Sequence, residues 1–104
     1  MDAEAALSAL GEPRRRAILR LVRDEPHAVG EIAEHLQITQ QAVSQHLKVL
    51  HEAGLVDVRA DGQRRLYAVR PDGLTGVADF LSELWPGALH RLKAAVEAGE
   101  DRHA

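Results

Sequence analysis

The stretch TQQAVSQHLKVLHEAGLV, residues 39–56, decides how this chain folds. Its apolar residues recur at helical spacing, so one side of a helix is expected to face a core. These residues are Val43, Leu47 and Leu50. Thr39 is placed to cap the first turn, accepting a bond from the backbone N–H of Gln41 or Ala42. Gly54 suits the left-handed position that ends a helix.

The opposite side of this helix carries amide and hydroxyl groups, where ordinary solvated helices favour Glu and Lys. Gln41, Gln45 and Lys48 lie on this side, and Gln40 and Ser44 lie on its flank. Such groups are either plain solvated side chains or readers of base edges. A glutamine can bond N6 and N7 of adenine together, and a serine can serve any base.

Composition limits the class of protein. The 104 residues suffice for one domain, and they are 45% hydrophobic but only 3% aromatic. An aliphatic core of this kind suits helix packing better than a β-sandwich. The chain has no cysteine, which excludes disulfides, thiolate metal sites and thiol-based redox sensing.

The chain also lacks the signals of membrane insertion and export. It has no apolar run of membrane-spanning length, so we expect no contact with a membrane. The beginning, MDAEAALSAL, is acidic and lacks the basic start of a signal peptide. We therefore expect a cytoplasmic protein.

Charge is unevenly distributed, although the formal net charge is only −3. Residues 40–70 hold more basic than acidic groups. The segments on either side, residues 1–39 and 71–104, hold more acidic than basic groups. The basic groups of this segment are Lys48, Arg59, Arg64, Arg65 and Arg70, against Glu52, Asp57 and Asp61. The positive balance coincides with the glutamine-rich helix, and the local field matters more for a nucleic acid than the total charge.

Three further helices are expected before residue 39. The first covers about residues 3–10 and the third about residues 29–36. The second begins at Pro13, which suits a first helical turn, and ends before Pro26. The segment GEPRRRAILRLVRDEP places five arginines largely outside the apolar face of the second of these. They are either a solvated basic face or include one or two phosphate contacts. The residues QIT then form a tight turn into the helix that follows.

Residues 55–69 predict a β-hairpin, because LVDVRA alternates and RRLYAV returns after the turn signal Asp61-Gly62. A two-residue loop at this pair would set Arg59 opposite Arg64, where like charges repel unless a phosphate lies near. After the hairpin, an apolar stripe predicts one long helical region over 71–98. Pro86 interrupts it, so we expect a kink or a short break there, and the unbroken phase of the stripe favours the kink.

This order of elements predicts a mainly α winged helix-turn-helix domain, with the helix-turn-helix at about 29–53 and the wing at about 55–69. The second helix of such a motif lies in the major groove. We expect DNA contacts from this helix and from the wing. The candidates are Thr39, Gln40, Gln41, Ser44, Gln45, His46, Lys48, Arg59, Arg64 and Arg65. Lys48 suits phosphate, and His46 is as well placed for packing or phosphate as for base reading.

Three segments resemble the ArsR-type winged helix-turn-helix repressors: ALGEPRRRAILRLV, EIAEHLQITQQAVSQHLKVLHEAGLV and ADGQRRLYAV. The resemblance implies a cytoplasmic, homodimeric bacterial repressor bound to a double-stranded DNA operator, and no enzyme. It implies a dimer seam of the first and last helices, at about 3–10 and 72–98. The seam residues would be Leu7, Leu10, Leu81, Leu84, Trp85, Leu89 and Leu92.

The chain departs from the metal-sensing members of this family. The segment PHAVGEIAEHL stands where soft-metal sensors carry a cysteine motif, and the last helix lacks the zinc-sensor spacing of Asp, His and Glu. The six histidines are scattered singly, and no set of three or four converging ligands is visible. We therefore expect no metal and no cofactor, and a similarity to the cysteine-free autorepressor-type members.

The sequence gives little support for an enzyme and leaves two other functions open. Ser44 and His46 are two residues apart on a helix and cannot form a nucleophile–base pair, and no glycine-rich phosphate loop follows a strand. A winged helix can instead bind a partner protein, and the acidic last third of the chain leaves room for that. A repressor released by an inducer, such as a small apolar ligand near Trp85, is a variant of the main prediction.

Overall fold

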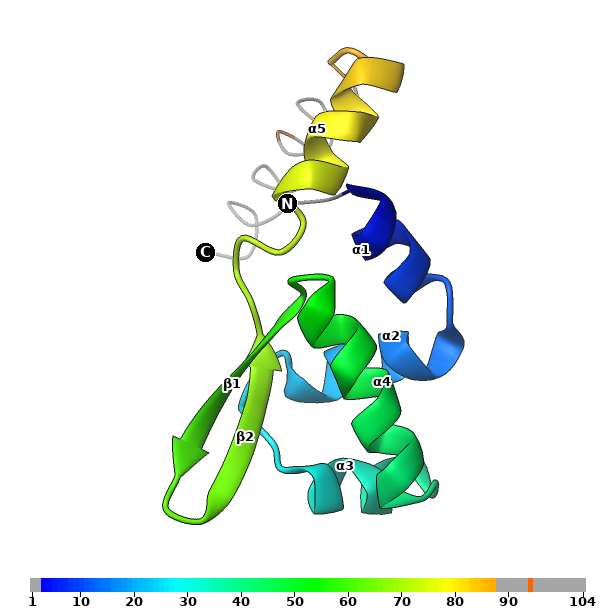
Figure 1. Cartoon of the computed structure of the whole chain (residues 1–104). Coiled ribbons are helices and arrows are strands. Elements are labelled where there is room, and N and C mark those ends of the chain that lie inside the picture. The colour runs from blue at the N-terminus through cyan, green and yellow to red at the C-terminus, as the bar shows by residue number, and fades with distance from the viewer. Residues whose placement is uncertain (1–2, 88–93, 95–104) are drawn as a thin grey trace.

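The computed structural model describes residues 3–87 and residue 94 of the chain. These residues form α1 (Ala3–Leu10), α2 (Pro13–Val22), α3 (Val29–Leu36), α4 (Gln40–Glu52), β1 (Val56–Asp61), β2 (Arg64–Val69) and α5 (Thr75–Leu84). Figure 1 shows α2, α3, α4 and the hairpin as one body, while α1 and α5 lie together beyond the C-terminal end of α4. None of the helices described is long and apolar enough to cross a membrane.

The core is aliphatic, as the composition predicts. Its largest fully buried side chains come from the three helices of the main body and the first strand. They are Ile18, Val22, Ile32, Val43, Leu47, Leu50 and Val56. The apolar side predicted for the helix of residues 39–56 is therefore confirmed, and this helix is the central element of the core.

Two arginines of the basic run have a structural role that the sequence pattern did not predict. The Nε of Arg15 donates to the carbonyl of Ala9 at 2.6 Å, and the Nη1 of Arg16 donates to the carbonyl of Leu10 at 2.7 Å. The last carbonyls of a helix have no partner within it, and a cation there also interacts favourably with the helix dipole. Arg15 and Arg16 therefore fasten the C-terminal end of α1 to the start of α2.

Both ends of α4 are set by local hydrogen bonds. At its start, the Oγ1 of Thr39 accepts from the backbone N–H of Ala42 at 3.0 Å, which confirms the predicted cap. At its end, Gly54 has φ = 77°, and its N–H donates to the carbonyl of His51 at 3.0 Å. The N–H of Leu55 reaches back to the carbonyl of Leu50 at 2.9 Å, which completes a Schellman motif.

The hairpin has a two-residue loop, but the loop begins one residue later than predicted, which shifts the strand pairing by two residues. The loop residues are Gly62 and Gln63, so Asp61 pairs with Arg64, and Arg59 pairs with Leu66. Gly62 has φ = 65°, which suits the first central position of a type II′ turn. This register sets opposite charges across the strands and avoids the pair of arginines that the other register would oppose.

A short third segment extends the hairpin. The N–H of His27 donates to the carbonyl of Tyr67 at 3.0 Å, and the N–H of Tyr67 donates to the carbonyl of His27 at 2.8 Å. The connection between α2 and α3 is thereby hydrogen-bonded to β2. This bridge fixes the base of the hairpin relative to the helix-turn-helix.

Of the kink and the short break expected at Pro86, the structure shows the break, so the preference for a kink is wrong. Helix α5 ends at Leu84, and Trp85 has φ = −131° and ψ = 79°. Proline disfavours the helical conformation for the residue before it, which explains the position of the break. The helix also begins at Thr75 and not at 72, and Ala94 is the only helical residue described beyond Gly87.

The segment between β2 and α5 packs closely on the end of α4. A Cβ atom on Gly73 would lie 2.8 Å from the carbonyl oxygen of Gly54 and 3.2 Å from the Cα of Leu55. Real Cβ contacts are essentially never that short, so an alanine here requires the backbone to shift. The close approach explains why a glycine occupies this buried position.

Gly73→Ala is expected to lower the free energy of unfolding by about 1–3 kcal/mol, the usual cost of overpacking a well-filled site. Gly30→Ala is the matched control, because the nearest atom to its Cβ would be the flexible Gln40 Nε2 at 3.5 Å. The control is expected to be neutral or slightly stabilising, since alanine is the better helix former. Chemical denaturation of both variants measures the difference, and equal stabilities would refute the close contact.

Candidate nucleic-acid interface

The turn between α3 and α4 consists of Gln37, Ile38 and Thr39. Gln37 has φ = 57°, a left-handed conformation that closes α3, and the N–H of Ile38 donates to the carbonyl of Ala33 at 3.2 Å. Ile38 is half-buried against the core. A short helix, a three-residue turn and a second helix thus form a helix-turn-helix, over the residues that the sequence predicts.

The outer side of α4 gathers four of the predicted DNA-contacting side chains in one open hollow. Gln41, Ser44, Gln45 and Lys48 line it and are all exposed. Within the described part of the chain, none of these four side chains makes a hydrogen bond or an ion pair. Their donors and acceptors are therefore available to an external partner. We call these four residues the outer row.

Two residues that the sequence analysis did not single out complete this hollow. Val49 is 38% exposed despite its size, and Glu52 lies at the far end of α4. Glu52 follows Lys48 by four residues, so helical spacing alone could have placed it on this side. The hollow therefore ends on an acidic group. This group would repel a polyanion, so the N-terminal part of the row is the more favourable place for one.

The remaining candidates on α4 lie at the edges of the outer row. Thr39 is exposed, and its oxygen accepts from Ala42. The Nε2 atom of Gln40 lies near Gly30 of α3, at 3.5 Å from where a Cβ on that glycine would stand. His46 is half-buried and does not line the hollow of the outer row.

Arg65 lies on the side of the hairpin that faces α4. Its strand partner is Ala60, and it lines a groove together with Ser44, Lys48 and Tyr67. The groove continues the outer row onto the hairpin. Arg65 and Lys48 thus bring two positive charges to one surface formed by α4 and β2.

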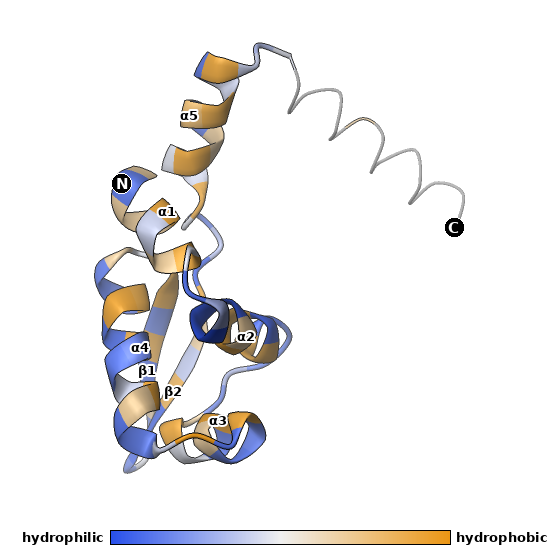
Figure 2. Ribbon diagram, turned by 90° about the vertical axis from the view of Figure 1, so that its right-hand side faces the viewer, coloured by the Kyte–Doolittle hydropathy of each residue, from blue (hydrophilic) through white to orange (hydrophobic). Residues whose placement is uncertain are grey.

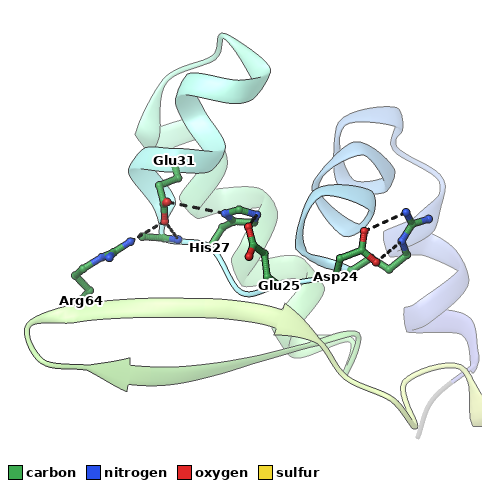
Figure 3. A network of polar contacts seen from close by, with 7 residues as sticks. Asp24, Glu25, His27, Glu31 and Arg64 are labelled. Carbon is green, nitrogen blue, oxygen red and sulfur yellow. Dashed lines mark hydrogen bonds and ion pairs between the residues drawn. The ribbon is translucent and has the colours of Figure 1, made fainter.

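Arg64 lies on the opposite side of the hairpin and is bound to α3. Its Nη2 atom donates to Glu31 Oε1 at 2.7 Å, as Figure 3 shows. The same oxygen accepts from the backbone N–H of Ala28 at 2.9 Å, and Glu31 Oε2 lies 4.0 Å from His27 Nδ1. Glu31 therefore connects the start of α3 to the tip of the hairpin. Arg59 shares this side of the hairpin and lies in a hollow with Asp57 and Leu66.

The bond from the backbone N–H of Ala28 holds the pKa of Glu31 below its ordinary range, and the charges of Arg64 and His27 act in the same direction. A lowered carboxylate pKa stabilises the folded state above the pKa of the unfolded chain. That contribution is lost as the pH falls through the lowered value. The contact between the hairpin and α3 is therefore expected to weaken in acid.

Glu31→Gln is expected to make the acid-induced loss of stability shallower than in the wild type. The measurement is the free energy of unfolding by denaturant at a series of pH values below neutral. Glu34→Gln is the control, because Glu34 is exposed on the same helix and makes no ion pair within the described residues. The prediction is contradicted if the stability of Glu31→Gln falls with pH as steeply as that of the wild type while the stability of Glu34→Gln falls less steeply. In that case Glu34, and not Glu31, would be the carboxylate that causes the acid dependence.

The surface predicted as a dimer seam is apolar and exposed. Leu7, Leu84 and Trp85 are 40%, 52% and 58% exposed, whereas Leu10 and Leu81 are half-buried against the core. Figure 2 shows α5 as a largely hydrophobic helix that extends from the body beside α1. Leu89 and Leu92 lie outside the described residues.

No group of three or more histidine, aspartate or glutamate side chains in the described residues could hold a metal ion. The described side chains also leave no buried polar atom without a partner. What the interface offers is hydrogen bonding and positive charge.

Comparison with known proteins assigns the family. Residues 12–58 match the family model for bacterial regulatory proteins of the arsR family. The HTH-type transcriptional regulator Rv2034 of Mycobacterium tuberculosis is 44% identical over 86 residues, which cover 83% of this chain and 80% of the relative. This chain belongs to the ArsR family. The family consists of DNA-binding transcriptional regulators and not of enzymes.

Other ArsR-family comparisons extend beyond the matched residues. The homodimeric winged helix-turn-helix DNA-binding domain Mb0332 of Mycobacterium bovis superimposes with a TM-score of 0.65, at 26% identity, over 83% of this chain and 80% of that one. The transcriptional activator HlyU of Vibrio cholerae is 33% identical over 76% of this chain and 73% of the relative. This ArsR-family regulator therefore has the winged helix-turn-helix fold, with α3–α4 as the motif and β1–β2 as the wing.

Proposed function

We propose that this ArsR-family protein is a sequence-specific repressor that acts as a homodimer on a pseudo-palindromic operator, including one at its own promoter. It works in the cytoplasm and responds to neither a thiol nor a metal signal. The absence of cysteine from the sequence supports the first of these two exclusions. The sequence of the last predicted helix, which lacks the zinc-sensor spacing of Asp, His and Glu, supports the second.

The outer row carries this proposal. Gln41, Ser44 and Gln45 present amides and a hydroxyl that are exposed and unbonded in the described structure, on the second helix of a helix-turn-helix. Such groups can bond the edges of bases in the major groove. Lys48 and Arg65 stand beside them, where phosphates would pass. The row therefore combines base reading with backbone contact on one surface.

A symmetric dimer would present two such rows. Successive major grooves on one side of DNA are about 34–36 Å apart, so two copies of α4 would read two half-sites. The exposed apolar residues of α1 and α5 lie away from the outer row and remain free to form the seam. A dimer that covers two half-sites within a promoter would hinder the polymerase, which is the basis of the proposed repression.

Arg64 requires an additional step before it can contact DNA. Its guanidinium is bound to Glu31 at 2.7 Å. A phosphate would have to share this side chain with the carboxylate or replace it. The tip of the wing therefore contributes less to affinity than an unpaired arginine would, and Arg65 contributes more.

Gln45→Ala is expected to change the preference at one base position by about 1–3 kcal/mol and to leave binding to random duplex nearly unchanged. Arg65→Ala is the contrasting variant, expected to weaken binding to all sequences and to reduce the salt slope by about one unit. Arg64→Ala is expected to reduce both by less, because Arg64 is paired with Glu31. The measurement is titration of duplexes that the wild type has enriched from a random pool, at several salt concentrations. Equal losses on enriched and random DNA for Gln45→Ala would contradict its role as a reader.

The direction of regulation needs its own test, because one relative is named as an activator. Transcription from the chain's own promoter in a purified system, with increasing amounts of protein, provides it. Repression predicts that the transcript decreases as the operator becomes occupied. An increase over the same range would refute the proposed direction and leave the DNA-binding function standing.

A further inference from the structure

A second hollow lies on a part of the molecule that the DNA interface does not use. It has a volume of about 280 Å³ and is formed by the end of α1, by α2, and by the segment that joins β2 to α5. Its walls are mainly apolar. The apolar side chains are those of Leu10, Leu19, Leu55, Val69 and Leu74. No residue of the outer row and no residue of α5 contributes to it, so it is also distinct from the position near Trp85 considered in the sequence analysis.

Three arginines line the same hollow, and no carboxylate does. Arg23 donates to Asp24 at 3.2 and 3.3 Å, and the Nε of Arg70 donates to Asp72 Oδ1 at 2.9 Å. Arg20 makes no ion pair within the described residues. The arginines can therefore bind a further anion. Arg20 can do so without first losing a bond to a carboxylate of the protein, whereas Arg23 and Arg70 are already paired.

We propose that this hollow binds a small amphiphilic carboxylate, a free acid with an alkyl chain of medium length. The chain would lie against the apolar walls, and the carboxylate would bond the guanidinium of Arg20 with support from Arg23 and Arg70. The volume is at the small end of ligand pockets, which are commonly about 300–1,000 Å³, so long chains and large ring systems are disfavoured.

The position of the hollow gives such a ligand a regulatory effect, a step that rests on the proposed function. Leu10 ends α1, and Leu74 precedes α5, so the two helices of the dimer surface both border the hollow. An occupant would change how α1 and α5 are held against α2 and α4. The spacing of the two recognition helices in the dimer would change with it, and the ligand would bind the DNA-free form more tightly.

The experiment is calorimetric titration of the full chain with monomeric sodium decanoate, without DNA. We expect one site per chain, with affinity about tenfold lower in Arg20→Gln, corresponding to about 1.4 kcal/mol. Arg14→Gln is the matched control, because Arg14 is exposed on the same helix and does not line the hollow. Leu74→Trp tests the apolar wall separately: Leu74 is 51% exposed, so a larger ring can fill the hollow without entering the core.

Three results would overturn the site. These are the absence of saturable binding, equal weakening by Arg14→Gln and Arg20→Gln, and unchanged binding in a folded Leu74→Trp variant. Phosphatidylglycerol vesicles form a second arm, because a lipid surface also presents apolar chains beside anions. Binding to vesicles without binding to monomeric decanoate would likewise contradict a site for a single free acid.

The regulatory effect is read from DNA titrations with and without decanoate. We expect decanoate to weaken operator binding by the wild type but not by Arg20→Gln. Unchanged operator affinity in the presence of bound decanoate would refute the coupling. Failure of the proposed function is distinguishable, because the ligand-free protein would then show no operator binding while calorimetry still decides the site.

Discussion

Replacing Leu84 with glutamate is expected to dissociate the proposed dimer into monomers and to weaken binding to paired half-sites by roughly a hundredfold. Leu84 is 52% exposed and stands next to Trp85, at the end of a helix that extends from the body. A charge buried without a partner in an apolar interface costs several kcal/mol, and a tenfold change corresponds to about 1.4 kcal/mol. Sedimentation measures the mass, and titration of a duplex with two half-sites measures the affinity.

Ser82→Glu is the matched control for this variant. It adds the same charge to the same exposed helix, at a residue that is polar and exposed and is not among the predicted seam residues. We expect it to remain dimeric and to bind as the wild type does. A dimeric Leu84→Glu protein would contradict the proposed seam, and a monomeric Ser82→Glu protein would show that any added charge disturbs α5.

Replacing Leu47 with alanine is expected to lower the free energy of unfolding by about 2–5 kcal/mol, the range for truncating a buried leucine. Leu47 is 1% exposed and lies at the middle of α4, between Val43 and Leu50. Its side chain holds the helix that carries the outer row against the body of the domain. Urea unfolding at one fixed protein concentration measures the effect, because dimerisation would add to stability.

Lys48→Ala is the control for Leu47→Ala, since Lys48 is the neighbouring residue and is exposed. An exposed substitution usually changes stability by less than about 0.5 kcal/mol. We expect Lys48→Ala to weaken DNA binding while unfolding at nearly the same urea concentration as the wild type. A loss below about 1 kcal/mol for Leu47→Ala would mean that α4 is not anchored as described.

The helices of the helix-turn-helix could be predicted from sequence because their signals are local. Apolar spacing selected the buried side of α4, Thr39 marked its start and Gly54 its end. Each of these signals acts through hydrogen bonds or packing between residues that are close in the chain. The outer row follows from the same spacing, since it is the opposite side of one helix.

The errors concern features that depend on competing or distant interactions. The hairpin register was wrong because Asp61 and Gly62 were both placed in the loop, whereas the glycine alone suits the first loop position. The preference for a kink over a break at Pro86 was wrong because the phase of an apolar stripe does not report whether the backbone is continuous. The pairing of Arg64 with Glu31 joins residues 33 positions apart, which no local pattern indicates.

The structural roles of Arg15 and Arg16 could not be predicted from the sequence pattern either. Arg15 and Arg16 bond the last carbonyls of α1, six residues earlier in the chain, across a bend. The geometry of that bend has to be known before these bonds can be inferred. His46 is a similar case, because its position between the two sides of the helix left its role open, and it is half-buried in the structure.

The measurement that tests the central claim most directly is binding of the purified protein to its own upstream DNA. A mobility shift would be run at two salt concentrations, with random duplex as competitor and a chelator in a parallel lane. We predict a shift that resists random competitor, weakens steeply with salt and survives chelation. Binding that random duplex abolishes, or that salt leaves unchanged, would contradict the account, and a shift lost on chelation would contradict its metal independence.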